Sequence, residues 1–302
     1  PYAVWSAAVP GRDLPSTFDP EQAEVWAAIT DPGGRKRRVS AFLYRAYTRG
    51  KDGRGRETLA PKGRVHWRVR VASGRVGRHT VRFLVRRKGG AEQVLGRTSF
   101  QVAETKDRAD GFLRVNEDPA DRFVFDSGKG YFALGHNVCW VKREQGTYGF
   151  DAYFRKMADT GENYTRVWLC TWGLSLDTRT PYEMDLADAW RLDHVLRRAQ
   201  ERGIYVKLCI DNFYDFRHHF EQSPFNQANG GPCAERGVFF TAPAAKAQYR
   251  ARLRYLVARY GAYTSLMAWE LWNEMDYALD PWDVEGAAAP KSFVTYADLR
   301  EK

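Results

Sequence analysis

The segment from Trp269 to Glu274, Trp-Glu-Leu-Trp-Asn-Glu, has the residue types needed for acid catalysis on a sugar. Its apolar residues predict a buried strand that ends in the pair Asn273 and Glu274, with aromatic rings on either side. A carboxyl group at a strand end, next to an amide and among tryptophans, is suited to protonating a glycosidic oxygen. Glu274 is therefore the candidate catalytic residue, and Asn273 is expected to hold a substrate hydroxyl beside the bond that breaks.

An acid of this kind needs a carboxyl group whose pKa is raised, either by apolar surroundings or by a neighbouring carboxylate. Several aromatic and apolar residues follow or accompany Glu274 along the chain. Those expected to provide the apolar surroundings are Trp272, Met275, Tyr277 and Trp282.

Glu270 is a second carboxylate in the same segment, and it shares strand parity with Glu274. It is expected to point into the interior of the fold. We interpret it as a buried structural carboxylate that pairs with Arg166 or Lys207.

The ends of the other predicted strands carry rings, amides and carboxylates. Rings can stack on the C–H face of a sugar, and amides and carboxylates can bind its hydroxyls. These strand ends offer neither a nucleophilic Ser with a His partner nor a two-His metal set, so we predict no metal and no cofactor. A single exposed Trp is more often a packing residue, but clustering after several strands favours a binding role. The candidate substrate-binding residues are Asn137, Trp140, Arg166, Trp168, Trp172, Asn212, Trp272, Asn273 and Trp282.

Residues 120–302 alternate strand-like and helix-like runs, which predicts parallel β-α units. The run Leu134–Asn137 lacks the glycine spacing of a dinucleotide fold, which favours a (β/α)8 barrel over a doubly wound sheet. A barrel needs about 250 residues, so we expect only its N-terminal half here. Strands are expected near 132–139, 164–170, 204–210 and 266–272, helices near 150–159, 188–202 and 244–260, a long loop over 211–243, and a last helix from Ser292.

Residues 1–105 show a period of two, with turn signals and no helical period between them. This pattern predicts antiparallel strands in an immunoglobulin-like sandwich. A polar connector is expected over 106–119, and a hairpin around the Ser-Gly-Lys-Gly sequence at 127–130 follows it. The alternation is expected to place four arginines on one solvent face: Arg68, Arg70, Arg82 and Arg86.

The formal net charge of +10 is concentrated in residues 1–115, which contain 24 Lys or Arg against 11 Asp or Glu. We interpret this excess as a solvated surface, and the alternatives are attraction to nucleic acid, anionic lipid or acidic polysaccharide.

No apolar run reaches the roughly 18 residues that would suggest a membrane span. Buried unpaired thiols are expected for the four cysteines, with a disulfide of Cys233 left open.

The segment 269–274 resembles the fourth-strand motif of clan A glycoside hydrolases, close to family 5 cellulases and mannanases. In that clan the Asn–Glu pair provides a hydroxyl-binding amide and the general acid/base, and Asn273 and Glu274 match it position for position. Arg166 resembles the arginine that supports the catalytic nucleophile. The run 125–137 resembles the hairpin and first strand that open such barrels, and the N-terminal sandwich resembles the immunoglobulin-like domain that precedes some bacterial members.

Two features depart from the family pattern. Many family 5 enzymes have a His near the end of the third strand, where this sequence has Ile210–Phe213. The nucleophile of the clan is a Glu on the seventh strand, beyond the four strands expected here. The resemblance therefore implies a barrel truncated after its fourth strand, with the nucleophile in a missing half.

The resemblance implies a retaining hydrolase of β-linked polysaccharide, located outside the cell or in the periplasm, with Glu274 as general acid/base. The expected partners are a polysaccharide or oligosaccharide substrate and the missing barrel half, so residues 1–302 alone are expected to turn over no substrate. The alternative is a non-catalytic glycan-binding protein that uses the basic sandwich and the aromatic half-site. A nucleic-acid binder is disfavoured because no RNA-binding motif is present, and no membrane partner is expected.

Overall fold

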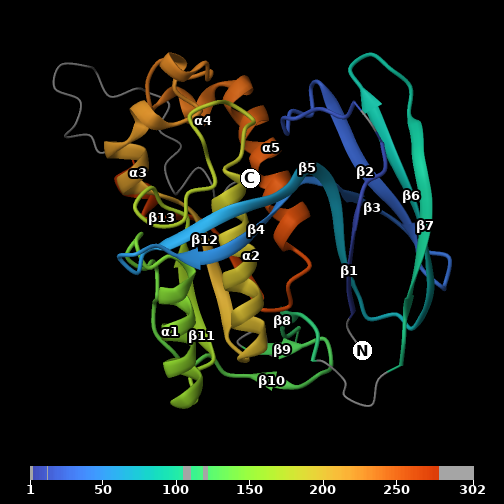
Figure 1. The fold of residues 1–302 in the computed structure, drawn as a ribbon, viewed down its shortest axis with the longest axis horizontal. Helices are drawn as coiled ribbons and strands as arrows, with labels where there is room; N and C mark the ends of the chain where they lie inside the picture. The colour runs from blue at the N-terminus through green and yellow to red at the C-terminus, as the bar shows by residue number, and fades with distance from the viewer. Residues whose placement is uncertain (1–2, 12, 105–109, 118–121, 279–302) are drawn as a thin grey trace.

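The N-terminal region folds into two antiparallel sheets that share one hydrophobic core (Figure 1). The computed structural model describes residues 3–11, 13–104, 110–117 and 122–278. The strand orders are β1-β5-β4 and β3-β2-β6-β7. The all-β prediction is confirmed, whereas the immunoglobulin-like assignment stays a prediction. The strands are β1 (Ala3–Ala8), β2 (Ala23–Thr30), β3 (Lys36–Ser40), β4 (Phe42–Lys51), β5 (Glu57–Ser73), β6 (Gly77–Arg87) and β7 (Gln93–Val102).

The expected row of solvent-facing arginines is wrong for two of its four members. Arg82 and Arg86 are exposed on β6, but Arg68 and Arg70 lie on β5, in the other sheet, and are half-buried or more. The side chain of Arg70 is only 9% exposed, and its Nη1 lies 2.6 Å from Oδ1 of Asp193 in the barrel region. The alternation of residue types identified the outward face, but it could not indicate that helices cover that face.

A small sheet connects the sandwich to the barrel region. The hairpin predicted around residues 127–130 is confirmed, with β9 (Phe123–Phe125) antiparallel to β10 (Gly130–Tyr131). The connector expected over 106–119 contains a strand, β8 (Leu113–Val115), which pairs with β9. Leu113 is buried there, and pairing with another segment gives this polar stretch a structure that its composition does not indicate.

Three of the four predicted parallel strands and the three predicted long helices are present in the described part of the barrel region. The sheet order is β11-β12-β13, and the helix–sheet core is apolar. Within the described ranges, no helix is both long enough and apolar enough to cross a membrane. The elements are β11 (Tyr164–Trp168), β12 (Tyr205–Asn212), β13 (Leu266–Asn273), α1 (Thr147–Asp159), α2 (Leu186–Glu201) and α5 (Pro243–Tyr260).

The strand expected at 132–139 does not form as a strand. Only a bridge from Gly135 to Tyr164 is present, although the segment runs beside β11. The hydroxyl of Thr165 accepts from the backbone N–H of Val138 at 3.1 Å and donates to the carbonyl of His136 at 2.9 Å. A side chain on β11 therefore occupies positions that backbone groups would fill in a regular ladder.

The loop expected over 211–243 is wrong, because much of it is helical. It contains α3 (Phe213–His218), α4 (Val238–Thr241) and two 3-10 turns, Phe220–Gln222 and Gln227–Asn229. A separate cluster of buried rings, including Phe220, Phe225 and Phe239, supports these short helices. The helix expected from Ser292 lies outside the described residues.

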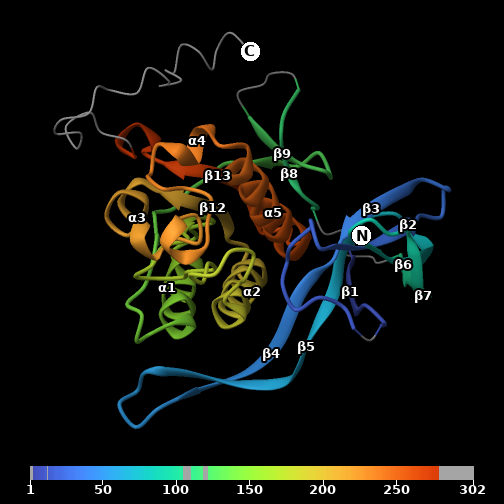
Figure 2. The same cartoon turned by 90° about the horizontal axis from the view of Figure 1, so that it is seen from above.

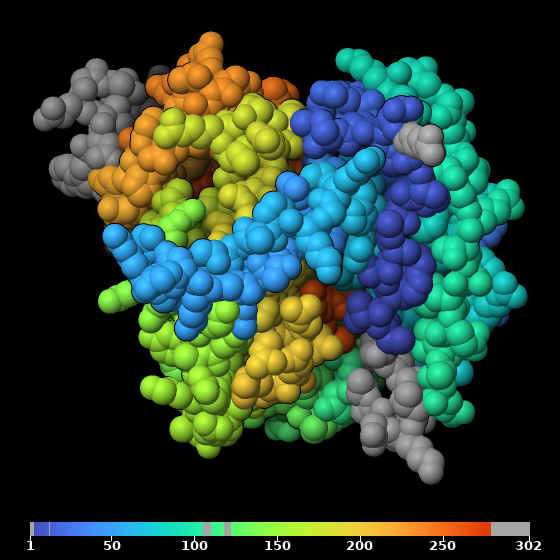
Figure 3. All heavy atoms as spheres, viewed as in Figure 1, coloured from blue at the N-terminus to red at the C-terminus, as the bar shows by residue number. Residues whose placement is uncertain are grey.

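The ends of β4 and β5 form a long arm that reaches from the sandwich across the helices of the barrel region (Figures 2 and 3). Glu57 on the arm accepts from Nε of Arg191 on α2 at 2.6 Å and from the backbone N–H of Thr147 on α1 at 2.9 Å. Arg49, also on the arm, lies 2.7 Å from the carboxylate of Asp151. The two regions are therefore tied by buried and half-buried polar contacts.

Candidate active site

Three charged side chains lie on neighbouring strands at the centre of the candidate site. Arg166 on β11 donates from Nε to Oε2 of Glu270 on β13 at 2.7 Å, and its Nη2 donates to the other carboxylate oxygen. Lys207 on β12 lies 3.3 Å from the same carboxylate. Burial would lower the pKa of Arg166, but hydrogen bonding and charge pairing with Glu270 outweigh it and raise that pKa. The structural pairing predicted for Glu270 is confirmed with both partners.

Asn273 is held by the same arginine. Its Oδ1 accepts from Nη2 of Arg166 at 2.7 Å, and the residue is only 6% exposed. This bond fixes the orientation of the amide, because Oδ1 must face the guanidinium. The amide nitrogen Nδ2 is buried and has no hydrogen-bond partner among the described residues. An unpaired buried donor costs about 1–3 kcal/mol, so a ligand oxygen that accepted from Nδ2 would be favoured.

Glu274 follows directly and has an unusual backbone conformation. Its φ of 50° and ψ of 55° are left-handed, which is rare for a residue with a long side chain. That conformation costs roughly 1–2 kcal/mol. The residue lies between the end of β13 at Asn273 and a 3-10 turn, Met275–Tyr277, and it is exposed. The turn places this carboxylate at the carboxyl edge of the sheet, where no hydrogen bond or ion pair joins it to another described side chain.

The apolar surroundings expected for Glu274 do not form from the described residues. Met275 and Tyr277 are about half exposed, at 48% and 51%. Trp272 is turned toward another cluster, where its ring centroid lies 5.0 Å from that of Phe216. The left-handed conformation of Glu274 redirects the chain that carries Met275 and Tyr277 immediately after the strand, whereas Trp272 lies on the strand itself and packs against Phe216. Trp282 lies outside the described residues.

The other three candidate tryptophans come together as a wall of rings. Trp140 contacts both Trp168 and Trp172, with centroids 5.4 Å apart in each case, and it is 44% exposed. Trp172 in turn contacts Tyr214 on α3 at 5.4 Å. The guanidinium of Arg166 lies 4.8 Å over the ring of Trp168, which joins the ring wall to the charged centre. The predicted clustering of these aromatic residues is therefore confirmed.

The two remaining candidates lie in different surroundings. Asn212 is buried, and its amide groups bond to protein: Oδ1 accepts from the backbone N–H of Asp215 at 2.8 Å, and Nδ2 donates to the carbonyl of Leu169 at 3.3 Å. It caps α3, and its predicted role in binding substrate stays a prediction. Asn137 is exposed beside β11, and its predicted role stays a prediction.

A polar contact that positions the ring wall was missed in the sequence. Asp215 on α3 accepts from the hydroxyl of Thr171 at 2.5 Å and from its backbone N–H at 2.9 Å. Nδ1 of His219 lies 2.8 Å from the same carboxylate. These bonds fix the loop that carries Trp172 against α3. The four-residue spacing of Asp215 and His219 is the sequence signal that would have indicated a helical pair.

The cysteines play no nucleophilic part in this arrangement. All four are unpaired, as predicted. Burial raises the pKa of Cys170 to about 12 and that of Cys209 to about 12, so both stay protonated thiols at neutral pH.

The sequence matches the model of one protein family, described as cellulase (glycosyl hydrolase family 5), over residues 125–295. That range includes the three parallel strands, the ring wall and the Arg166 cluster.

Curated relatives align with about half of the chain. The probable mannan endo-1,4-beta-mannosidase A of Aspergillus flavus is 30% identical over 168 residues, which are 50% of this chain and 41% of that protein. The mannan endo-1,4-beta-mannosidase A of Emericella nidulans is 27% identical over 165 residues, 51% of this chain and 42% of that protein. The chain thus spans less than half the length of these relatives.

A solved structure, a putative glycoside hydrolase from Bacteroides vulgatus, has a similar fold over 92% of this chain and 50% of its own, with a TM-score of 0.59 and 15% identity. At that identity the likeness concerns the fold alone, and it covers the sandwich as well as the barrel region. The family match covers more than half of the sequence, and the chain belongs to glycosyl hydrolase family 5, the cellulase family.

Proposed function

We propose that the protein containing this chain is a retaining glycoside hydrolase of β-linked polysaccharide outside the cell or in the periplasm, with β-mannan as the first substrate to test. The family match and the curated relatives, which are named as mannan endo-1,4-beta-mannosidases, support this substrate class. The observation that carries the proposal is the buried amide nitrogen of Asn273 beside the carboxylate of Glu274, neither of which has a partner among the described residues.

In this proposal Glu274 is the general acid/base. It protonates the leaving glycosidic oxygen and then removes a proton from the water that completes hydrolysis. Nδ2 of Asn273 donates to a sugar hydroxyl next to the bond that breaks. Arg166 is a positioning residue, because it fixes the Asn273 amide and neutralises Glu270. Trp140 and Trp168 offer ring faces to neighbouring sugars.

A retaining reaction also needs an attacking carboxylate, about 5–5.5 Å from the acid/base. Glu270 is paired with Arg166 and Lys207, and Asp215 with Thr171, so neither is free for attack. We propose that the attacking carboxylate comes from outside the described residues, in the part of a (β/α)8 barrel that would face β11–β13. The anomeric carbon would be attacked from the side opposite Glu274.

The test measures release of reducing sugar from β-mannan by the whole protein and by its Glu274→Gln variant. General acid catalysis contributes about 10²–10⁴-fold, and the variant should lose activity in that range. On a substrate with an aryl leaving group that needs no protonation, the loss should be much smaller. Asp159→Asn is the matched control, because this exposed carboxylate at the end of α1 is also replaced by its amide.

Activity that survives Glu274→Gln on unactivated mannan would refute the role of Glu274. A whole protein that hydrolyses no β-linked polysaccharide, while binding one, would instead support a glycan-binding function.

A further inference from the structure

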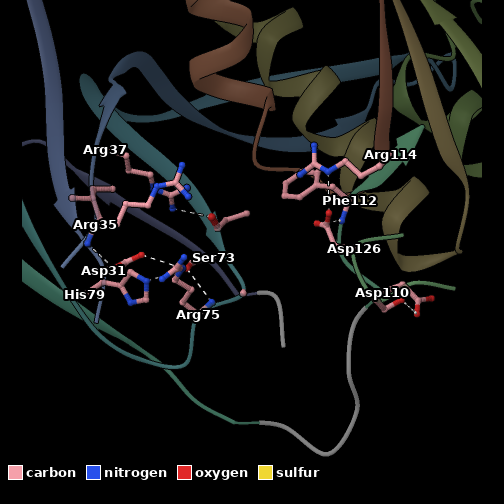
Figure 4. A pocket seen from close by; sticks show the side chains of 14 residues that line it. Asp31, Arg35, Arg37, Ser73, Arg75, His79, Asp110, Phe112, Arg114 and Asp126 are labelled. Carbon is pink, nitrogen blue, oxygen red and sulfur yellow. Dashed lines mark hydrogen bonds and ion pairs between the residues drawn. The ribbon is translucent and has the colours of Figure 1, made fainter. Parts of the chain in front are cut away.

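A cleft of about 600 Å³ lies far from Glu274 in the chain, between the sandwich and the β8–β9 hairpin. Figure 4 shows Arg35, Arg37 and His79 on the sandwich side and Phe112 and Arg114 on the hairpin side. Its volume is within the roughly 300–1,000 Å³ of small-molecule sites. None of the groups proposed for catalysis lines this cleft.

The carboxylates of the cleft each have a basic partner. Asp31 lies 3.1 Å from Nε of Arg75, and Asp126 lies 2.9 Å from Nε of Arg114. Asp110 also lines the cleft, and it lies 3.0 Å from Nζ of Lys129, which is not part of the lining. The acidic side chains are therefore already paired.

Two guanidinium groups on the sandwich side of the cleft, those of Arg35 and Arg37, have no such partner among the described residues. Among the described residues, neither Arg35 nor Arg37 forms an ion pair, and Arg37 donates only from Nη2, to the carbonyl of Ala72 at 2.9 Å. Burial and then the neighbouring charge of Arg35 lower the pKa of Arg37, with partial relief from Asp31. Desolvation is the larger cause, and the second cause, repulsion from Arg35, reflects two positive charges that lie close together on this side of the cleft. The cleft therefore has unused donors in a locally cationic setting.

The hairpin wall adds an aromatic surface. The ring of Phe112 is half-buried in the lining, with Cζ of Arg114 lying 5.6 Å from its centroid. An aromatic ring opposite a cationic pair suits a ligand with one apolar face and one anionic group.

We propose that this cleft binds a saccharide that carries a carboxylate, with Arg35 and Arg37 gripping the carboxylate and Phe112 packing against the sugar ring. A guanidinium fork matches a carboxylate in two-bond geometry. The paired carboxylates would accept hydrogen bonds from sugar hydroxyls, which a saccharide with one carboxylate per ring offers between its charges. They would repel the closely spaced phosphates of a nucleic acid. The inference concerns binding only, and it does not depend on turnover at Glu274.

The test uses residues 1–302 and titrates trigalacturonate as the probe by isothermal calorimetry, with mannotriose as the neutral comparison. The double variant Arg35→Gln/Arg37→Gln should weaken binding at least about tenfold, since it removes the charge-assisted hydrogen bonds that both guanidinium groups would make to the carboxylate. The control is Arg82→Gln/Arg97→Gln, which removes the same charge from exposed residues that face each other across β6 and β7.

Binding of trigalacturonate that is lost in the first double variant and kept in the control, with weak binding of mannotriose, supports the proposal. If both double variants weaken binding of trigalacturonate equally, the binding depends on general charge attraction and the proposal is overturned. No binding at a concentration of about 10 mM, or equal binding of mannotriose, would overturn it too. A short DNA duplex that binds more tightly than trigalacturonate would favour nucleic acid instead and refute the assignment. Circular dichroism of both variants verifies that they fold.

Discussion

Replacing Asp193 by Asn tests whether the sandwich and the barrel region are one unit of stability. Asp193 on α2 accepts from Nη1 of Arg70 in the sandwich at 2.6 Å and from Nη2 of Arg259 on α5 at 2.7 Å. The hydroxyl of Tyr263 adds a bond at 3.1 Å. The Arg259 side chain is fully buried, and Nη1 of this residue also donates to the carbonyl of Leu43 in the sandwich at 3.2 Å. One carboxylate therefore compensates two buried cations that come from different regions.

The expected loss in free energy of unfolding follows from the two buried guanidinium groups that Asp193→Asn leaves without a carboxylate. Asn keeps the size of the side chain and part of its hydrogen bonding, but it removes the one negative charge that, within the described ranges, pairs with both guanidinium groups. Breaking a buried pair by removing one partner costs about 3–5 kcal/mol. A loss at the upper end is expected, because Arg259 cannot reach water. The total free energy of unfolding of a domain is about 5–15 kcal/mol, so this single change would remove a large part of it.

The assay is urea unfolding of residues 1–302, followed by tryptophan fluorescence and by far-ultraviolet circular dichroism. The unaltered chain should unfold in one transition that both signals report together. Asp193→Asn should lower the midpoint and separate the two signals, because the contact between the regions weakens first. Glu201→Gln on the same helix is the control: its pair with Arg198 is half exposed and should contribute about 0–1 kcal/mol. A loss for Asp193→Asn no larger than that of the control would refute the reasoning.

Three other predictions follow from the contacts described. Arg166→Lys should lower kcat on β-mannan about 10²-fold with little change in KM, because one ammonium cannot hold both Glu270 and Asn273 in place; a change in KM alone would contradict this in steady-state kinetics. Asn212→Ala should lower the free energy of unfolding by about 1 kcal/mol through loss of the α3 cap and leave saccharide affinity unchanged, as thermal melts and calorimetry would report. Burial alone would raise the pKa of Asp151, but its partners hold that pKa well below its usual value. Its contribution to stability is therefore complete above pH about 4 and lost as the pH falls further, so Asp151→Asn should flatten the fall in unfolding free energy between pH 4 and 2.

The sequence predicted best where periodicity and local chemistry agree. The parallel strands, the three long helices and the hairpin were recognised from apolar patterns and glycine stops, such as Gly203 after α2. The pairing of Glu270 with Arg166 and Lys207 followed from strand parity and charge.

The failures share a physical cause, which is contact between residues far apart in the chain. The alternation in its strand predicts an exposed side chain for Arg70, but a helix more than a hundred residues later in the chain covers it. The segment at 132–139 has a strand-like composition, but the hydroxyl of Thr165 takes hydrogen bonds that a ladder would need. Asn212 looks like a free amide at a strand end, although the helix that it caps begins with the next residue. None of these partners can be read from the local pattern.

The left-handed backbone of Glu274 has a consequence for how this position would respond to selection. Glycine adopts that conformation at little cost, so replacing Glu274 by Gly would relieve strain while deleting the carboxylate. A screen that selects for thermal stability alone would therefore enrich glycine at position 274. The selected variants would lose the acid catalysis proposed for Glu274. If glutamate is retained at such a strained site, the reason would be its role in catalysis and not its contribution to stability.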